Sequence, residues 1–446
     1  MPARKLFGTD GVRGRADEIF SDDFVESLGQ AVVAELGGDH ASIAILRDTR
    51  ESGPRIEQAF ARGAAAAGAD VKLAGVLPTP AAPVLIQHFG FSLVAVVSAS
   101  HNPFYDNGIK FFGADGMKLG DAVEARIEAR MAAHGDTQDT AAAHQRTGSI
   151  TELHGAELDY LRAVNQRFGE LDLTGWKILI DCANGATYNV APEMLRRLGA
   201  SVDVLGDKPD GININEGCGS THLELLTAAI QAGDYDIGFA FDGDGDRLMA
   251  VDADGRALDG DELIALAASH LAAKGELGGG VAVTVMTNYG FHQAMEAANI
   301  EVAITDVGDR YVLEELVRRD WSLGGEQSGH IIHRAFLSTG DGLAGALLVL
   351  EALVASGKSL AAADVMQKLP QLLVNVTVAD RAAIAGATTV WQAVEAAQTA
   401  LEGRGRVLVR ASGTEPLVRV MAEAPTEAEA AEVCNQLAAL IKSELA

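Results

Sequence analysis

Cysteine is scarce in this sequence, with three residues among 446, and Cys182, Cys218 and Cys434 lie far apart. Their odd number and wide spacing exclude a disulfide framework and the paired spacing typical of zinc sites. No apolar run approaches the roughly 18 residues that a membrane span needs, and the first residues lack the apolar core of a signal peptide. We therefore expect a reduced, cytoplasmic protein with no membrane partner.

Basic residues are also few, since 35 Lys and Arg face 62 Asp and Glu, for a net charge of −27. This balance argues against non-specific binding to nucleic acid or to anionic membranes. If the substrate is an anion, the surface repels it at long range. A small set of basic residues must then be concentrated at the site.

The length and the hydrophobic content of 48% predict three or four domains with large buried cores. Apolar strands alternate with helices up to about residue 367 and form three similar blocks, each with a polar loop after a strand. From Leu372 the pattern changes to a small α+β domain. We expect three similar α/β domains with mixed, mainly parallel sheets, followed by that small domain, over residues 1–152, 153–254, 255–367 and 368–446.

The strongest local signal is Asp242-Gly-Asp-Gly-Asp246, which directly follows the predicted buried strand 237–241. Three carboxylates within five residues repel one another unless a cation lies among them, and hard oxygen ligands suit Mg²⁺ or Ca²⁺. An EF-hand loop is excluded because its expected glycine and glutamate positions hold Arg247 and Ala253. The remaining alternative is a solvated acidic turn.

A second polar loop follows the buried strand 94–97 and has the sequence Ser98-Ala-Ser-His-Asn-Pro103. Ligands of open α/β sheets bind at such strand ends, although a single motif of this kind is also common in turns without chemistry. A hydroxyl of Ser98 or Ser100, or a phosphate carried on it, would give the metal a further oxygen ligand. Arg247 would then face the same phosphoryl group.

Two further loops have the composition of anion-binding sites. Phe7-Gly-Thr-Asp-Gly-Val-Arg-Gly14 is a glycine-rich turn with Arg13, and Arg410-Ala-Ser-Gly-Thr-Glu-Pro416 surrounds a glycine whose N–H can face an oxyanion, with Arg419 nearby. The plain alternative for each is a hairpin.

The loop Gly324-Gly-Glu-Gln-Ser-Gly-His330 has the composition of a sugar-binding segment. Glu326 and Ser328 can bind hydroxyl groups, and His330 can transfer a proton. Taken alone, His330 is equally compatible with a structural role.

Together these loops resemble the α-D-phosphohexomutase family over essentially the whole chain. The loop of residues 7–14 and the segment Glu326-Gln-Ser-Gly329 resemble the branch of this family that interconverts glucosamine 6-phosphate and glucosamine 1-phosphate. That reaction feeds UDP-N-acetylglucosamine and cell-wall synthesis. The resemblance implies four domains around a central cleft. The four signatures that carry it occur in order: Ser98-Ala-Ser-His-Asn-Pro103, Asp242-Gly-Asp-Gly-Asp-Arg247, Gly324-Gly-Glu-Gln-Ser-Gly-His330 and Arg410-Ala-Ser-Gly-Thr-Glu-Pro416.

The resemblance also implies a phosphate on Ser100, one Mg²⁺ per site and a sugar bisphosphate that is both activator and intermediate. The metal would be held by Asp242, Asp244, Asp246 and the phosphate on Ser100. The partner is a phosphosugar, and a homodimer is suggested. Either an activating kinase or autophosphorylation would first phosphorylate Ser100.

The remaining site residues implied by the resemblance fall into two groups, with the general acid and base unassigned. Substrate binding would use Glu326, Ser328, Arg410, Ser412, Gly413, Thr414 and Arg419. The reacting centre would contain Arg13, His101, Lys110, Arg247 and His330.

The sequence leaves three alternatives open. The first is phosphomannomutase or phosphoglucomutase specificity, against which only Gln327 argues. The second is a metal-dependent phosphatase that acts through phosphoserine, and the third is a sugar-phosphate sensor without catalysis.

Overall fold

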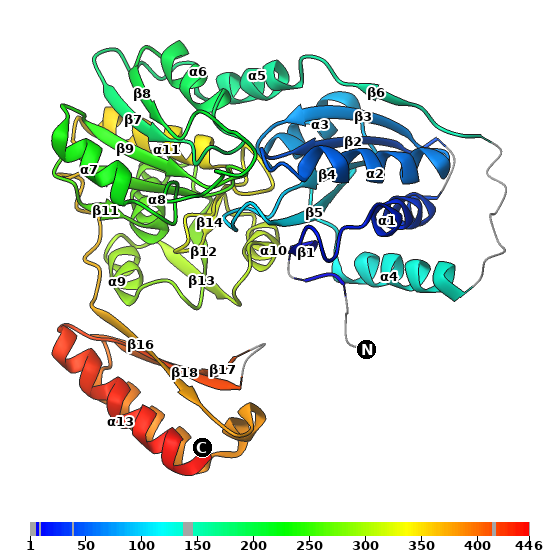
Figure 1. Cartoon of the computed structure of the whole chain (residues 1–446). Helices are drawn as coiled ribbons and strands as arrows, with labels where there is room; N and C mark the ends of the chain where they lie inside the picture. Colours follow the sequence, from blue (N-terminus) through cyan, green and yellow to red (C-terminus); the bar gives the residue numbers. More distant parts are fainter. Residues whose placement is uncertain (1–5, 9, 38–39, 137–145, 413–415, 446) are drawn as a thin grey trace. The chain divides into compact units, whose positions relative to one another are not determined.

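The chain forms two compact units in a computed structural model that describes residues 6–8, 10–37, 40–136, 146–412 and 416–445 (Figure 1). The first unit comprises Met1–Met286 and Val302–Asp364, and the second comprises Thr287–Glu301 and Val365–Ala446. Three sheets lie in the first unit, and a small antiparallel sheet lies in the second. The four domain ranges expected from the sequence stay predictions.

The first sheet has the strand order β1-β5-β4-β2-β3-β6. It carries the loop of residues 98–103, called the serine loop below. Strands β4, β2, β3 and β6 run parallel, whereas β5 is antiparallel to both β4 and β1. Every residue of β4 is buried, as the run of apolar residues predicts. The elements are β1 (Val12–Arg15), α1 (Asp22–Glu35), β2 (Ser42–Arg47), α2 (Gly53–Ala66), β3 (Asp70–Val76), α3 (Ala81–Phe89), β4 (Leu93–Val97), β5 (Asp106–Gly113), α4 (Asp121–Asp136) and β6 (Ile150–Glu152).

The second sheet has the order β11-β10-β9-β7-β8. It carries the loop of residues 242–246, called the aspartate loop below. Strands β9 and β10 are antiparallel neighbours, and the aspartate loop is their connection. Strand β10 also pairs with β11 in an antiparallel hairpin. The elements are α5 (Ala156–Phe168), β7 (Lys177–Asp181), α6 (Val190–Arg197), β8 (Ser201–Leu205), α7 (Glu224–Ala232), β9 (Ile237–Phe241), β10 (Leu248–Asp252) and β11 (Ala257–Leu258).

The third sheet has the order β13-β12-β14-β15. The predicted sugar-binding loop of residues 324–330, called the sugar-type loop below, connects β14 to β15. Helix α8 begins with a capping box in which Asp259 and Glu262 each accept a hydrogen bond from the other's backbone N–H. The elements are α8 (Gly260–Lys274), β12 (Gly280–Thr284), β13 (Glu301–Thr305), α10 (Asp309–Arg319), β14 (Leu323–Gly325), β15 (Ile331–His333) and α11 (Gly342–Ser356).

The second unit is built on an antiparallel sheet in the order β16-β18-β17. One face of β18, with Val418 and Val420, joins a core with Leu437 and Ile441 of α13. The opposite face carries Arg419, because neighbouring strand residues alternate in direction. The elements are α9 (Tyr289–Ala297), β16 (Gln371–Thr377), the 3₁₀ helix η1 (Arg381–Gly386), α12 (Thr388–Ala400), β17 (Arg406–Ala411), β18 (Leu417–Glu423) and α13 (Glu427–Leu445).

All three cysteines are free and buried, in agreement with the absence of a disulfide framework. Burial raises the pKa of each thiol above its usual value. Within the described part of the chain, the helices are too short or too polar to cross a bilayer.

Candidate active site

The serine loop brings a hydroxyl group directly against the aspartate loop. Ser100 is 1% exposed, and its Oγ donates a hydrogen bond to Asp242 Oδ2 at 2.5 Å. Its φ of +54° places it in the left-handed region that residues with a side chain rarely adopt. By contrast, the Ser98 hydroxyl accepts a hydrogen bond from the Ser100 N–H at 2.9 Å and donates one to Asp48 Oδ2 at 2.6 Å. Of the two candidate hydroxyls, Ser100 is therefore the one that faces a carboxylate of the aspartate loop.

The three aspartates of the loop after β9 converge as metal ligands do. Asp242, Asp244 and Asp246 are buried, and one oxygen from each lies within 4.8 Å of the others. Among the described residues, Asp244 Oδ1 and Asp246 Oδ1 have no hydrogen-bond partner. Burial, followed by repulsion from its two neighbours, raises the pKa of Asp242 well above the usual range. Such a site fits Mg²⁺, whose charge would offset this repulsion.

The aspartate loop approaches the serine loop through Gly243. A Cβ added to Gly243 would lie 2.6 Å from the Ser100 carbonyl oxygen and 2.7 Å from Ile214 Cδ1. Only glycine therefore allows the two loops to pack at this distance.

Lys110 on β5 lies among the carboxylates. Its Nζ is 2.7 Å from Asp244 Oδ2, 3.3 Å from Asp246 Oδ2 and 3.2 Å from Asp10 Oδ2. Burial alone would lower the pKa of Lys110, but these carboxylates outweigh it and raise the pKa. Lys110 is therefore a permanent positive charge in this arrangement.

Lys110 belongs to a closed ring of six charged side chains with alternating sign. From Asp10 the ring passes to Lys118 at 2.6 Å, from Lys118 to Asp309 at 2.5 Å, and from Asp309 to His330 Nε2 at 3.3 Å. His330 Nδ1 then lies 3.6 Å from Asp246, which returns to Lys110. All three sheets of the first unit are connected through this ring.

His330 has neighbours that suit both of its protonation states. Burial would lower the pKa of His330, but Asp246 and Asp309 outweigh it and raise the pKa to about 10. The Gly340 N–H also lies 3.1 Å from Nε2, a contact that suits the uncharged ring. The two carboxylates stabilise the charged ring more than the single Gly340 N–H stabilises the uncharged one, so the charged form of His330 is favoured.

The other predicted reacting residues, His101, Arg247 and Arg13, lie close enough for their charges to interact. His101 Nδ1 is 3.4 Å from Ser100 Oγ, and burial, followed by the charges of Arg247 and Arg13, lowers the pKa of His101 to about 4. Arg247 Nε is 3.9 Å from Asp246 Oδ1, and Arg13 forms an ion pair with Asp10. The basic residues are thus concentrated at this site despite the acidic composition.

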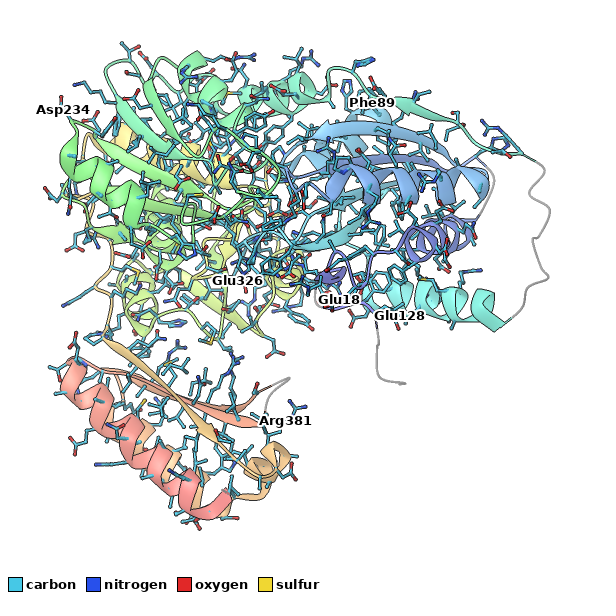
Figure 2. The ribbon with its side chains drawn as sticks, viewed as in Figure 1. Glu18, Phe89, Glu128, Asp234, Glu326 and Arg381 are labelled. Carbon is cyan, nitrogen blue, oxygen red and sulfur yellow. The ribbon has the colours of Figure 1, made fainter. Side chains whose placement is uncertain are left out.

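The sugar-type loop, of which Glu326 is labelled in Figure 2, contacts the end of the aspartate loop in the first unit. The Gly329 carbonyl accepts the Leu248 N–H at 2.9 Å, directly after Arg247. Glu326 Oε1 accepts the N–H of Gly308 at 3.1 Å. The Glu326 and Ser328 side chains are partly exposed, so a ligand can reach them.

The predicted phosphate-binding loop of residues 410–416, called the phosphate loop below, belongs to the second unit. Arg410 and Arg419 are directly opposite across β17 and β18, so their side chains share one face of the sheet. Ser412 is buried, and its carbonyl accepts a hydrogen bond from Arg381 at 2.7 Å. Two arginines at this spacing repel each other, and a bound anion would relieve the repulsion. The predicted residues Gly413 and Thr414 lie outside the described part of the chain.

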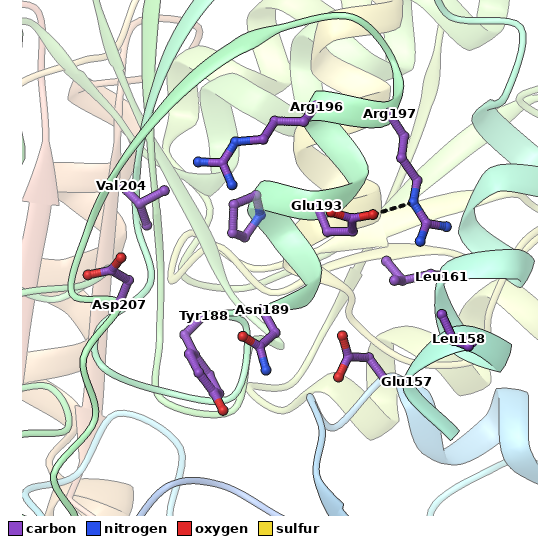
Figure 3. A pocket seen from close by; sticks show the side chains of 11 residues that line it. Glu157, Leu158, Leu161, Tyr188, Asn189, Glu193, Arg196, Arg197, Val204 and Asp207 are labelled. Atoms are coloured by element: carbon purple, nitrogen blue, oxygen red, sulfur yellow. Dashed lines mark hydrogen bonds and ion pairs between the residues drawn. The ribbon is translucent and has the colours of Figure 1, made fainter. Parts of the chain in front are cut away.

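A separate cavity of about 580 Å³ lies between α5, α6 and the end of β8 (Figure 3). Its basic residues are already used, since Arg197 pairs with Glu193 at 2.8 Å and Arg196 donates to the Val202 carbonyl at 3.0 Å. None of the predicted site residues lines this cavity.

Sequence reasoning missed Asp10, Lys118 and Asp309 of the charged ring, and Arg381 beside the phosphate loop. Asp10 had a usable signal, because it lies inside the glycine-rich motif with Arg13. The other three have no local signal, since their partners are distant in sequence.

The chain matches four domain families along its length. These are the alpha/beta/alpha domains I, II and III of phosphoglucomutase/phosphomannomutase, over residues 4–138, 158–255 and 259–371, and the C-terminal domain of the same proteins, over residues 373–440.

Curated proteins similar to the chain are named phosphoglucosamine mutase. The protein of Desulforudis audaxviator is 48% identical, with coverage of 98% of this chain and 97% of that protein. The protein of Pelotomaculum thermopropionicum is 47% identical, with coverage of 98% and 99%.

Solved structures share the fold. A phosphoglucomutase/phosphomannomutase family protein from Burkholderia thailandensis superimposes with a TM-score of 0.80 at 24% identity, covering 98% of this chain and 97% of that one. Aspergillus fumigatus N-acetylphosphoglucosamine mutase in complex with GlcNAc-6P and magnesium has a TM-score of 0.70 at 19% identity, covering 98% and 96%.

Proposed function

We propose that this chain, which belongs to the phosphoglucomutase/phosphomannomutase family, interconverts glucosamine 6-phosphate and glucosamine 1-phosphate through a phosphoserine. The observation that carries the chemistry is the Ser100 hydroxyl, held 2.5 Å from a carboxylate of a buried aspartate triad. The amino-sugar substrate is supported by relatives at 43–48% identity that are named phosphoglucosamine mutase.

We infer that Asp242, Asp244 and Asp246 hold Mg²⁺ together with a phosphate on Ser100. The magnesium reported for the fungal N-acetylphosphoglucosamine mutase supports this choice of ion. When bound, the ion would neutralise charge on the transferring phosphoryl group.

In the proposed reaction, the anomeric hydroxyl of glucosamine 6-phosphate takes the phosphoryl group of Ser100. An O–P bond forms at the sugar, the Oγ–P bond breaks, and the hydroxyl proton moves to a neighbouring base. His101 is suited to hold a proton beside Ser100 Oγ, because its ring is uncharged at neutral pH. The sugar bisphosphate then turns and returns its 6-phosphoryl group to Ser100, which releases glucosamine 1-phosphate.

Other side chains supply binding and charge. Lys110, Arg247 and Arg13 would offset negative charge near Ser100. Glu326 and Ser328 would bind sugar hydroxyls. In the second unit, Arg410, Ser412 and Arg419 would bind the phosphate that is not transferred, with Gly413 and Thr414 as predicted from the resemblance.

The test is a coupled assay with glucosamine, mannose and glucose phosphates, combined with intact mass. We expect preference for the glucosamine phosphates and a phosphoryl adduct mapped to Ser100. Ser100→Ala should lower turnover by at least about a thousandfold, because no covalent carrier remains. Ser201→Ala, on the exposed start of β8, is the matched control.

Two results would contradict the proposal. A large preference for mannose or glucose phosphate would reassign the substrate. Release of inorganic phosphate in step with substrate loss would indicate a phosphatase, since a mutase transfers the group back to the sugar.

A further inference from the structure

Arg50, in the loop between β2 and α2, is completely buried, and its guanidinium directs three of its five hydrogen bonds to carbonyls of the serine loop. Its Nε donates to Asp48 Oδ2 at 2.8 Å, so its charge is balanced locally. A guanidinium has five N–H donors, and here all five are used. The other four go to backbone carbonyls: Ser100 at 2.9 Å, Asn102 at 2.8 Å, Asp106 at 3.0 Å, and Pro103.

Asp48 extends this support to the other side of Ser100. Besides Arg50, it accepts a hydrogen bond from the Ser98 hydroxyl at 2.6 Å. Ser98 Oγ in turn accepts the Ser100 N–H at 2.9 Å. Both polar groups of the Ser100 backbone are therefore held, the N–H through Ser98 and the carbonyl by Arg50.

This support coincides with a backbone conformation that needs it. Ser100 has a φ of +54°, and a residue with a side chain keeps such a conformation only where its surroundings impose it. Asn215, in the segment between β8 and α7, adds a donor to the Ser100 carbonyl at 2.9 Å. The orientation of the Ser100 hydroxyl toward Asp242 thus depends on contacts outside the serine loop.

The loop that carries Arg50 also contacts the region of the second sheet. Thr49 Oγ1 donates to the Asn184 carbonyl at 2.5 Å, and the Glu51 N–H donates to the Gly211 carbonyl at 2.9 Å. A single loop, residues 48–51, therefore contacts both the serine loop and the segments beside the aspartate loop.

We propose that Arg50 is a positioning residue for phosphoryl transfer, acting on Ser100 through the loop backbone. This inference rests on the proposed function, in which Ser100 carries the phosphoryl group. All N–H groups of Arg50 are used, so it does not bind that phosphoryl group. It fixes the backbone while the charge on the Ser100 side chain changes by about 1.5 to 2 in each half-reaction.

The test compares Arg50→Lys with Arg47→Lys on the full chain. Lysine keeps the charge beside Asp48 but has three donors on one atom, so it cannot replace the planar fork. Arg47, at the end of β2, pairs with Glu57 at 3.3 Å and also donates to the Asp48 carbonyl at 3.3 Å. It is a matched control because it tests the same change of side chain next to the loop of residues 48–51, and both of these hydrogen bonds lie outside the serine loop. We expect Arg50→Lys to lower kcat about a hundredfold with KM within about threefold, because a small misplacement of reacting groups has an effect of that size.

A second variant covers the case in which Arg50→Lys does not fold. Ser98→Ala removes only the bridge between Asp48 and the Ser100 N–H, and we expect kcat about tenfold lower with KM unchanged. Phosphorylation by glucose 1,6-bisphosphate, followed by intact mass, should be slower in both variants. Equal loss of kcat and rise in KM would not fit a positioning role.

The outcomes separate this inference from the proposed function. If the unmodified protein does not turn over glucosamine phosphates, the proposed function is wrong, whatever the variants do. If it does, and a folded Arg50→Lys matches Arg47→Lys in kcat, the positioning role is wrong. Where only Ser98→Ala folds, unchanged kcat in that variant overturns it.

Discussion

Asp244 shows how one side chain can serve several partners at the candidate metal site. One oxygen accepts hydrogen bonds from Thr79 Oγ1 at 2.6 Å and Lys110 Nζ at 2.7 Å. The other oxygen has no hydrogen-bond partner among the described residues. The first oxygen therefore fixes the carboxylate, which leaves the second available to a cation.

Asp244→Asn should weaken Mg²⁺ binding at least about tenfold, because the neutral amide is a poorer ligand for a hard cation. The measurement is activity as a function of Mg²⁺ concentration, supported by calorimetric titration. Asp254→Asn, an exposed carboxylate in the neighbouring hairpin, is the control. An unchanged Mg²⁺ dependence in Asp244→Asn would remove this residue from the ligand set.

At the residue scale, sequence reasoning succeeds where the chemistry is contiguous. Three aspartates within five residues repel one another in any fold, so their role is visible in the sequence itself. Lys118 and Asp309 are 191 residues apart and gain meaning only when the first and third sheets place them 2.5 Å from each other. Arg50 is missed for the same reason, since its partners are backbone carbonyls of another loop.

At the scale of elements, the packing of the aspartate loop on the serine loop leaves no room for a side chain in place of Gly243. Gly243→Ala would press a methyl group against the Ser100 carbonyl and Ile214. We expect kcat to fall about tenfold or more, and the free energy of unfolding to fall by roughly 1 to 3 kcal/mol, as in other overpacked sites.

Steady-state kinetics and urea unfolding measure the two effects of Gly243→Ala. Gly120→Ala is the control, because a Cβ there would meet no atom within 4 Å. Should both variants behave alike, close packing of the two loops would not be important.

Helix α11 begins at a buried carboxylate that should make stability depend on pH. Asp341 is the N-cap, accepts the Ala344 N–H at 3.0 Å and also contacts the Tyr160 hydroxyl. Burial raises the pKa of Asp341 from 3.8 to about 6. The folded state therefore favours the protonated form, and this contribution is complete below about pH 4 and lost as the pH rises through 6.

Asp341→Asn should flatten this dependence, because asparagine keeps a capping oxygen without a charge. Relative to the unmodified protein, the variant should gain roughly 2 to 3 kcal/mol in unfolding free energy above pH 7 and little near pH 4. Urea unfolding at pH 4, 6 and 8 provides the comparison. Parallel pH curves for the two proteins would contradict it.

The elements that the sequence predicts are those with a clear boundary signal. Strand β4 ends at Val97, shortly before the turn at Asn102-Pro103. Helix α13 begins directly after Thr426, whose Oγ1 accepts the Glu429 N–H at 3.2 Å. Helices α8 and α11 are buried on nearly all sides, so they lack the polar face that makes a helix visible in a sequence. Strand β5 begins inside Asp106-Asn-Gly, which looks like a turn.

At the scale of the whole molecule, the net charge of −27 should oppose compact folding through self-repulsion. Raising NaCl from about 10 to 200 mM shortens the screening length severalfold, so we expect the unfolding temperature at pH 8 to rise by a few degrees. The same comparison at pH 5 is the internal control, because protonation of carboxylates reduces the charge. An equal effect at both pH values would point to a bound ion instead.

The three buried cysteines give the molecule a practical property. Thiol reagents attack the thiolate, and burial together with a raised pKa keeps each native sulfur inert. A single cysteine introduced on the surface, for example at Lys208 or Glu402, would then be the one reactive handle on the folded chain. Fluorescent or spin labels could follow the protein through its catalytic cycle without removal of any native residue.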